Sequence, residues 1–149
     1  MEVGQSTINV RTVTTGDYDE LIALWKASGA GFRPRGRESR EAFNEQIERF
    51  PKLSLVAEDG GRIVGVVLGS HDGRKGWINR LAVLPEYRRR GIAAILVPAC
   101  DTAIRAQGIE IVAALVESDN PASSALFRKL GYSDAIAVQY FRKLSHPEA

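Results

Sequence analysis

The feature that most constrains the fold is a pair of apolar segments, residues 77–83 and 111–116, separated by a helical stretch. Between them, apolar residues recur at helical spacing from Ile92 to Ile104, and Gly108 follows as a typical helix end. Two strands joined through a helix run parallel, with a right-handed crossover. The segment 111–116 is a continuous apolar run, which predicts a strand buried on both faces.

The helix of this unit carries one unusual residue. Pro98 lies inside it, and proline has no N–H to donate while its ring crowds the carbonyl of Ala94. The sequence therefore predicts a kink, with the Ala94 carbonyl turned to another partner or to water.

The remaining elements surround this unit. Asp17, with Glu20 three residues later, resembles the capping box of a helix that ends at Gly29. Asp59-Gly60-Gly61 joins two Val-rich runs and is typical of a hairpin. Asn120 and Pro121 suit the start of a helix. We expect further strands at residues 7–13, 53–58, 63–69 and 135–144, and a further helix at residues 43–50. Together these elements predict a single α/β domain over residues 1–149, with a mixed sheet flanked by four helices.

Composition excludes several classes of protein. The chain has 149 residues with 44% hydrophobic and 26% charged residues, which are values of a folded globular domain. A formal charge of +2 gives no reason to expect a nucleic-acid partner, and no apolar run reaches the ~20 residues of a membrane span. One cysteine permits no internal disulfide, and the start lacks a secretory pattern. The expected form is cytoplasmic, with a homodimer left open.

The segment with the most chemical content is RRRGIA at residues 88–93, where a strand gives way to a helix. The first turn of a helix presents N–H groups without internal partners, and together with the helix dipole they attract anions. Gly91 lets the backbone approach a ligand closely, and Arg88, Arg89 and Arg90 add positive charge. A pyrophosphate fits such a site, although an exposed basic turn would have the same sequence. Neither a Walker loop nor a dinucleotide fingerprint is present.

At this point the sequence resembles the GNAT N-acetyltransferases. The pattern Arg88-x-x-Gly91-x-Ala93, following LAVLPEY, is similar to the acetyl-CoA signature of that family, and NPASSALFRKLGY at residues 120–132 is similar to its later helix. The stretches DYDELIALW at 17–25 and VAEDGGRIVGVVLG at 56–69 also resemble the family. The resemblance covers nearly the whole chain and implies a V-splayed mixed sheet of about six to seven strands, with coenzyme A entering between residues 77–83 and 111–116.

The resemblance also implies the residues that bind the cofactor. Backbone groups of the strand would hold the pantetheine arm, backbone N–H groups at the helix start would hold the pyrophosphate, Asn120 would contact the arm or cap its helix, and Phe127 would pack beside the thioester. The implied set is Leu81, Ala82, Val83, Arg88, Arg89, Arg90, Gly91, Ile92, Ala93, Asn120 and Phe127. No metal is implied.

The catalytic residues are less well defined. The family often has a tyrosine where this chain has Phe127, and a phenylalanine cannot protonate the departing thiolate. A thiol pKa near ~8.5 makes an unassisted departure cost only about 2 kcal/mol at neutral pH, and Tyr140 is a substitute candidate. Some members carry a glutamate where this chain has Leu115; Glu117, two residues further on, or a water held by Asn79 are candidates for the base.

Two questions stay open at this stage. Arg33, Arg35, Arg37 and Arg40 lie between the first two helices, where they could select an anionic substrate or form a solvated loop. The expected function is transfer of an acetyl group from acetyl-CoA to an amine acceptor. A non-catalytic acyl-CoA-binding module is the alternative, favoured by Phe127 and by Leu115.

Overall fold

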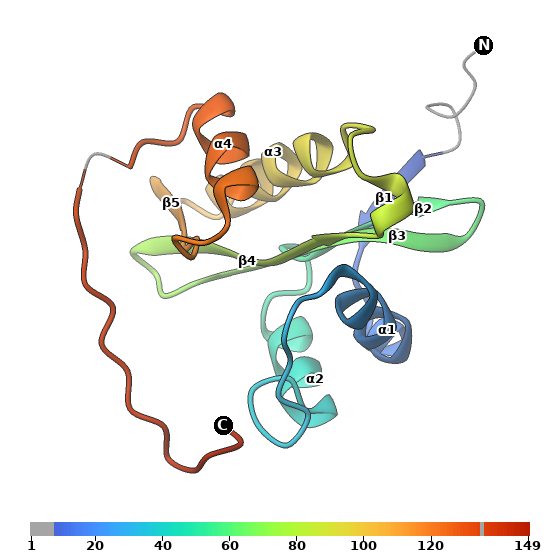
Figure 1. The fold of residues 1–149 in the computed structure, drawn as a ribbon, viewed down its shortest axis with the longest axis horizontal. Helices are drawn as coiled ribbons and strands as arrows, with labels where there is room; N and C mark the ends of the chain where they lie inside the picture. The colour runs from blue at the N-terminus through green and yellow to red at the C-terminus, as the bar shows by residue number, and fades with distance from the viewer. Residues whose placement is uncertain (1–7, 135) are drawn as a thin grey trace.

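A computed structural model describes residues 8–134 and 136–149 (Figure 1). The sheet has the strand order β1-β2-β3-β4-β5, with antiparallel pairs throughout except for the parallel pair of β4 and β5. The elements in chain order are β1 Ile8–Thr12, η2 Thr15–Asp17, α1 Tyr18–Ser28, α2 Arg40–Arg49, β2 Leu55–Asp59, β3 Arg62–His71, β4 Lys75–Val83, η3 Pro85–Tyr87, α3 Ile92–Arg105, β5 Ile111–Ala114 and α4 Pro121–Lys129.

The helices cover both faces of the sheet. Figure 1 shows α1 and α2 on one face and α3 and α4 on the other. The central strand β3 is buried along most of its length, and Trp25 of α1 and Leu96 of α3 are among the fully buried side chains that pack onto the two faces. The predicted mixed α/β sheet, the hairpin between β2 and β3, and the parallel pair are confirmed. Among the described residues, no helix is long and apolar enough to cross a membrane.

The parallel pair is short, and this determines the shape of the sheet. Residues of β4 and β5 pair only from Lys75 with Ile111 to Ile78 with Ala114, whereas β4 continues to Val83. Beyond Ile78, β4 therefore has no strand beside it on this side, and the two chains diverge. The V-shaped splay expected from the resemblance is present at this point.

The prediction that residues 111–116 are buried on both faces is wrong. The strand β5 lies at the edge of the five-stranded sheet, where Ile111 is 53% exposed and Leu115, just after the strand, is 61% exposed. An apolar run indicates a strand, but whether the strand is central or at an edge depends on what pairs with it.

The predicted sixth strand, residues 135–144, is also wrong for the part that the structure describes. Residues 136–144 form no strand, and their apolar side chains are exposed, with Phe141 at 85%. The tail follows a long path away from the sheet (Figure 1), and its end contacts the loop between α1 and α2. There Arg35 pairs with Glu148 at 3.2 Å and Arg37 donates to the Ala149 carbonyl at 3.0 Å. Over the part of the chain that the structure describes, the sheet thus has five strands rather than six or seven.

The expected capping box is displaced by one turn. The Asp17 carboxylate accepts a hydrogen bond from the backbone N–H of Thr14 at 2.8 Å, so the box lies at Thr14 and Asp17. The Glu20 carboxylate instead accepts a hydrogen bond from the backbone N–H of Ile63 at 2.9 Å, which connects α1 to the hairpin of β2 and β3. Arg11 completes the ion pair with Asp17 at 2.9 Å.

Helix α3 lies unusually close to β3 because glycines face it. A β-carbon added at Gly65 would lie 2.8 Å from Ile92 Cγ2, and one added at Gly69 would lie 2.9 Å from Cys100 Sγ, both atoms of α3. The helix runs through Pro98 without ending, and the proline lies on its exposed face, as does Ala94. The close approach of α3 fixes where its N-terminus lies relative to β4.

Candidate active site

The site begins with an irregularity in β4. Across β3 and β4, Val66 pairs with Ala82 and Leu68 pairs with Asn79, so Arg80 and Leu81 together face one residue of β3. This is a β-bulge, and Arg80 has φ +56°, which a non-glycine residue adopts at a cost. The bulge lies where β4 leaves β5, so it changes the direction of the strand at the opening of the splay.

Helix α1 holds this bulge in place through Trp25. The indole Nε1–H donates a hydrogen bond to the Arg80 carbonyl at 3.0 Å, and the Arg80 guanidinium lies 4.7 Å from the centre of the indole ring. Trp25 itself is only 1% exposed. Trp25 therefore belongs to the core, and it also fixes both the backbone and the side chain of Arg80.

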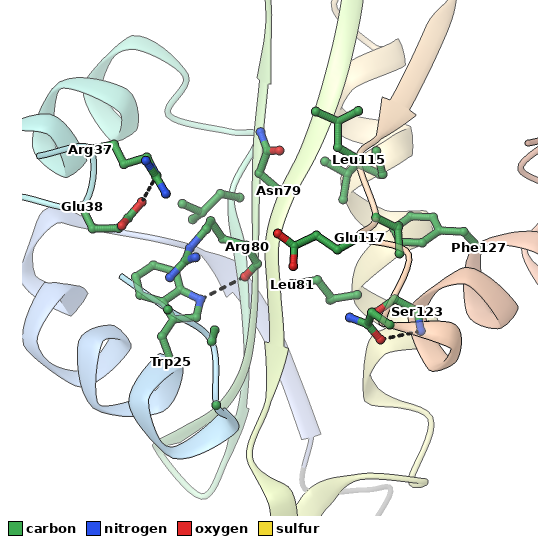
Figure 2. A pocket seen from close by; sticks show the side chains of 18 of the residues that line it. Trp25, Arg37, Glu38, Asn79, Arg80, Leu81, Leu115, Glu117, Ser123 and Phe127 are labelled. Carbon is green, nitrogen blue, oxygen red and sulfur yellow. Dashed lines mark hydrogen bonds and ion pairs between the residues drawn. The ribbon is translucent and has the colours of Figure 1, made fainter. Parts of the chain in front are cut away.

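A cavity of about 800 Å³ lies beside the bulge, and we call it the Trp25 cavity. Its walls are α1 with the loop that follows it, β4, and the segment from the end of β5 into α4 (Figure 2). Figure 2 shows Glu117 extending from the segment after β5 toward β4. The polar and charged side chains of its lining are Tyr18, Arg37, Glu38, Gln46, Asn79, Arg80, Glu117, Asp119, Asn120 and Ser123.

A second cavity, of about 830 Å³, lies at the start of α3, and we call it the Gly91 cavity. Gly91 is the N-cap of α3, has φ +78°, and makes no side-chain cap. The first backbone bond of the helix is from Ile95 N–H to the Gly91 carbonyl, so the N–H groups of Ile92, Ala93 and Ala94 precede the regular ladder. These donors and the helix dipole make this end of the cavity attractive to an anion.

Most of the predicted cofactor-binding residues line the Gly91 cavity. Arg88 donates to the Ser28 carbonyl at 3.0 Å, which ties the arginine segment to the end of α1. Arg90 is different, because it is not part of the lining and its guanidinium stacks 4.8 Å from the Tyr87 ring. The predicted residues found in the lining are Leu81, Ala82, Val83, Arg88, Arg89, Gly91, Ile92, Ala93 and Asn120.

The two cavities adjoin each other. Both are lined by Gly29, Ala30, Leu81, Asn120 and Ser123. Asn120 accepts a hydrogen bond from the Ser123 backbone N–H at 3.2 Å, so it caps α4 as the sequence suggested and also lies at the junction of the cavities. A molecule bound in the Gly91 cavity can therefore reach into the Trp25 cavity past Leu81.

The structure brings two of the three candidate catalytic residues together. Asn79 and Glu117 line the Trp25 cavity from facing walls, together with Phe127, which is 8% exposed. Tyr140 lies in the tail, is 70% exposed, and lines neither cavity. Tyr132 packs edge-on against Phe127 at 5.2 Å, but its hydroxyl bonds to Asp101, and its burial raises the pKa of the phenol.

The arginine loop contributes less to the cavity than its composition suggests. Only Arg37 of its four arginines lines the Trp25 cavity, and it pairs with Glu38 at 3.3 Å. Arg40 bonds to Asp19 at 2.7 Å and lies over the Tyr18 ring. The sequence analysis did not identify Arg80, which also lines this cavity. One signal was available in the sequence, since Arg80 is the one charged residue within the expected strand 77–83.

Arg80 has an unusual environment. Its Nε and Nη2 atoms are buried and have no hydrogen-bond partner among the residues that the structure describes. Burial lowers the pKa of the guanidinium and outweighs the attraction of Glu38, although an arginine stays protonated throughout the physiological range. A buried cation without an acceptor is costly, so its presence here requires an explanation.

Comparisons with known proteins identify the family to which this chain belongs. The profile of the Acetyltransferase (GNAT) family matches residues 18–132. An acetyltransferase of Sodalis glossinidius is 32% identical over 125 residues, which cover 84% of this chain and 87% of the relative. A Yersinia pestis acetyltransferase is 31% identical over 137 residues, 92% of this chain and 96% of its own length. This chain belongs to the GNAT family of acetyltransferases.

Solved structures share the fold at lower identity. The PaiA N-acetyltransferase of Thermoplasma acidophilum, determined in complex with coenzyme A, aligns with a TM-score of 0.75 at 21% identity, over 85% of this chain and 89% of that one. The enzyme AAC(6')-Iy, in complex with a bisubstrate analogue of coenzyme A and acetylneamine, aligns with a TM-score of 0.75 at 21% identity, over 92% of this chain and 98% of that one. At these identities the likeness establishes the fold.

Proposed function

We propose that the chain transfers an acetyl group from acetyl-CoA to an amine by direct attack within the two adjoining cavities. The observation that carries the proposal is the junction at Leu81 and Asn120, where a cavity headed by free helix N–H groups meets one that contains a carboxylate. The first suits a pyrophosphate and the second an amine. The complexes of structural neighbours with coenzyme A or its analogue support coenzyme A as the kind of ligand that this fold binds.

The cofactor would lie along the free side of β4. Beyond Ile78 this strand has lost its partner, so alternate N–H and C=O groups on that side are left without ladder bonds. The pantetheine arm carries two amides that can pair with them at Leu81, Ala82 and Val83. A backbone N–H of β4 near Leu81, which borders both cavities, would then polarise the thioester carbonyl and stabilise the negative charge of the tetrahedral intermediate.

The acceptor would enter from the Trp25 cavity. An ammonium must lose a proton before it attacks, and Glu117 lines this cavity as an acceptor of that proton, directly or through a water held by Asn79. The amine nitrogen then bonds to the acetyl carbon and releases its second proton to water, and the carbon–sulfur bond breaks. Phe127 offers no proton to the sulfur, so the thiolate leaves as the anion and takes a proton from solvent.

The placement of the cofactor is tested with two glycines of equal backbone geometry. Gly91 and Gly108 have φ +78° and +88°, and each has open space where a side chain would go. Valine at either position incurs a similar strain of about 1–2 kcal/mol, but only at Gly91 does the new side chain stand between the ligand and the helix N–H groups. Calorimetric titration with acetyl-CoA should show at least ~30-fold weaker binding in Gly91→Val, the equivalent of about 2 kcal/mol, and unchanged binding in Gly108→Val.

Turnover is tested separately by release of coenzyme A over a panel of amines. Equal affinities in Gly91→Val and wild type would refute the placement of the pyrophosphate. Tight binding of acetyl-CoA with no release of coenzyme A for any amine would favour the non-catalytic module.

A further inference from the structure

Arg80 lines the Trp25 cavity but has no partner there. Its guanidinium lies against the Trp25 ring, and within residues 8–134 and 136–149 two of its buried nitrogens have no hydrogen-bond acceptor. The bulge at φ +56° and the bond from Trp25 to the Arg80 carbonyl fix its position. Backbone strain and an unsatisfied buried donor are both costly, and proteins retain such features mainly where a ligand later makes use of them.

The nearest internal candidate for a partner is already engaged. Glu38 lines the same cavity, but one oxygen of its carboxylate accepts the Arg33 backbone N–H and the other lies 3.3 Å from Arg37. The charge of Glu38 is thus balanced by other groups, and the charge of Arg80 is left over on this wall. A planar guanidinium presents parallel N–H donors that match a carboxylate with two hydrogen bonds.

The opposite wall of the Trp25 cavity has the opposite charge. Glu117 and Asp119 line it from the segment after β5, and among the described residues neither carboxylate forms an ion pair. Figure 2 shows Arg80 extending from β4 toward α1, whereas Glu117 extends from the segment after β5 toward β4. A cavity with a cation on one wall and carboxylates on the other complements a molecule that carries both charges.

We propose that Arg80 binds the carboxylate of the acceptor, so that the substrates of this enzyme are small amino-carboxylic acids whose ammonium group faces Glu117. The proposal rests on the acetyl transfer proposed above and names its substrate class. The arrangement disfavours polycationic acceptors, because Arg80 repels them and gains no acceptor for its donors. The sequence analysis considered the arginines between α1 and α2 for selection of an anionic substrate, whereas this proposal assigns that role to Arg80 of β4.

The test compares each amino acid with its own amide, for which phenylalanine with phenylalaninamide and methionine with methioninamide are suitable pairs. The amide lacks the negative charge, and its amine has the lower pKa, near the ~7.7–8.0 of a peptide amino group. At pH 8 more of the amide is unprotonated, so without a site for the carboxylate the amide would be the better acceptor. We expect kcat/KM at saturating acetyl-CoA to favour the acid by between about 10- and 100-fold, as for a charge-assisted pair, mainly through KM.

The variant Arg80→Met keeps the apolar stem over Trp25 and removes the donors. It should abolish the preference for the acid, Arg80→Lys should retain part of it, and Arg74→Met, at an exposed turn outside both cavities, should retain all of it. If Arg80→Met fails to fold, the ratio of acid to amide in the wild type decides alone. Spermidine and kanamycin serve as polycationic acceptors.

The outcomes separate the two proposals. Failure to bind acetyl-CoA, or to release coenzyme A with any amine, overturns the proposed function and this inference with it. Acetylation of amides, spermidine or kanamycin at rates equal to or above those of the amino acids leaves the function standing and overturns the role of Arg80. A preference for the acid that persists in Arg80→Met overturns it as well.

Discussion

The contact between α3 and β3 offers a way to move the cofactor site without touching it. Gly65 and Gly69 lie four residues apart on β3, and both face α3. Gly65 lies under the first turns of the helix, against Ile92 and Leu96, whereas Gly69 lies under Cys100, further along. Alanine at either position inserts one methyl group into the same layer of packing. Only at Gly65 is the N-terminus of α3 pushed away from β4.

The sizes of the two effects follow from the distances. A β-carbon at Gly65 would lie 2.8 Å from Ile92 Cγ2, so the atoms must separate by roughly 0.7 Å to reach ordinary contact. Overpacking of this kind costs about 1–3 kcal/mol, offset by about 0.5–1 kcal/mol from removing a glycine within a strand. At Gly69 the obstacle is the Leu53 carbonyl oxygen at 2.5 Å, which is backbone and yields less readily. Gly69→Ala should therefore be the more destabilising of the two.

The affinity for acetyl-CoA should fall more in Gly65→Ala than in Gly69→Ala, which is the opposite of the order expected for stability. We expect Gly65→Ala to bind about 5- to 30-fold more weakly, which corresponds to 1–2 kcal/mol from misplaced N–H donors, and Gly69→Ala to bind as the wild type does. Urea denaturation gives the free energies of unfolding, and calorimetry gives the affinities. If affinity in the two variants follows stability, or if Gly65→Ala loses stability and no affinity, then the position of α3 does not set the site.

Two further predictions concern pH. Burial alone would raise the pKa of Asp17, but hydrogen bonds from Arg11 and Thr14 hold the pKa below its usual value. A carboxylate whose pKa is lower in the folded than in the unfolded protein stabilises the fold at pH values above its unfolded-state pKa of ~3.9. This stabilisation is lost as the pH falls through the folded-state pKa. Asp17→Asn should thus lose about 1–3 kcal/mol of unfolding free energy at pH 7, and in urea titrations this difference should shrink below about pH 4; a difference independent of pH would contradict the assignment. Because Phe127 cannot ionise, kcat/KM should rise with pH and then level off, with no falling limb near pH 10, where a tyrosine acid would lose its proton. A falling limb that vanishes in Tyr140→Phe, with a large drop in kcat, would make Tyr140 the acid after all.

Local signals in the sequence predicted the local structure well. The hairpin at Gly60 and Gly61, the crossover through α3 and the cap at Asn120 each depend on residues close together in the chain, and all are present. The placement of Gly91 at the start of α3 belongs to the same class. These features follow from turn chemistry and periodicity, which a single segment contains in full.

Features that depend on distant partners were not predictable in the same way. The tail around Tyr140 has the apolar alternation of a strand, but a strand also needs an edge to pair with, and the tail runs elsewhere. The bulge at Arg80 arises from the register between β3 and β4, which neither strand specifies alone. The loop arginines looked available for a ligand, but Arg35 and Arg37 bond to residues more than 110 positions away.

The shared wall of the two cavities has a thermodynamic consequence. Since Leu81 and Asn120 border both, a ligand in one cavity becomes part of the surface that the other ligand meets. Whatever factor the cofactor adds to the affinity for the acceptor, the acceptor must add to the affinity for the cofactor. A search for acceptors with the cofactor-free protein therefore measures affinity for an incomplete binding surface. Protein loaded with a non-reactive analogue of acetyl-CoA presents the complete binding surface, and an acceptor that binds there should in turn slow the release of the analogue.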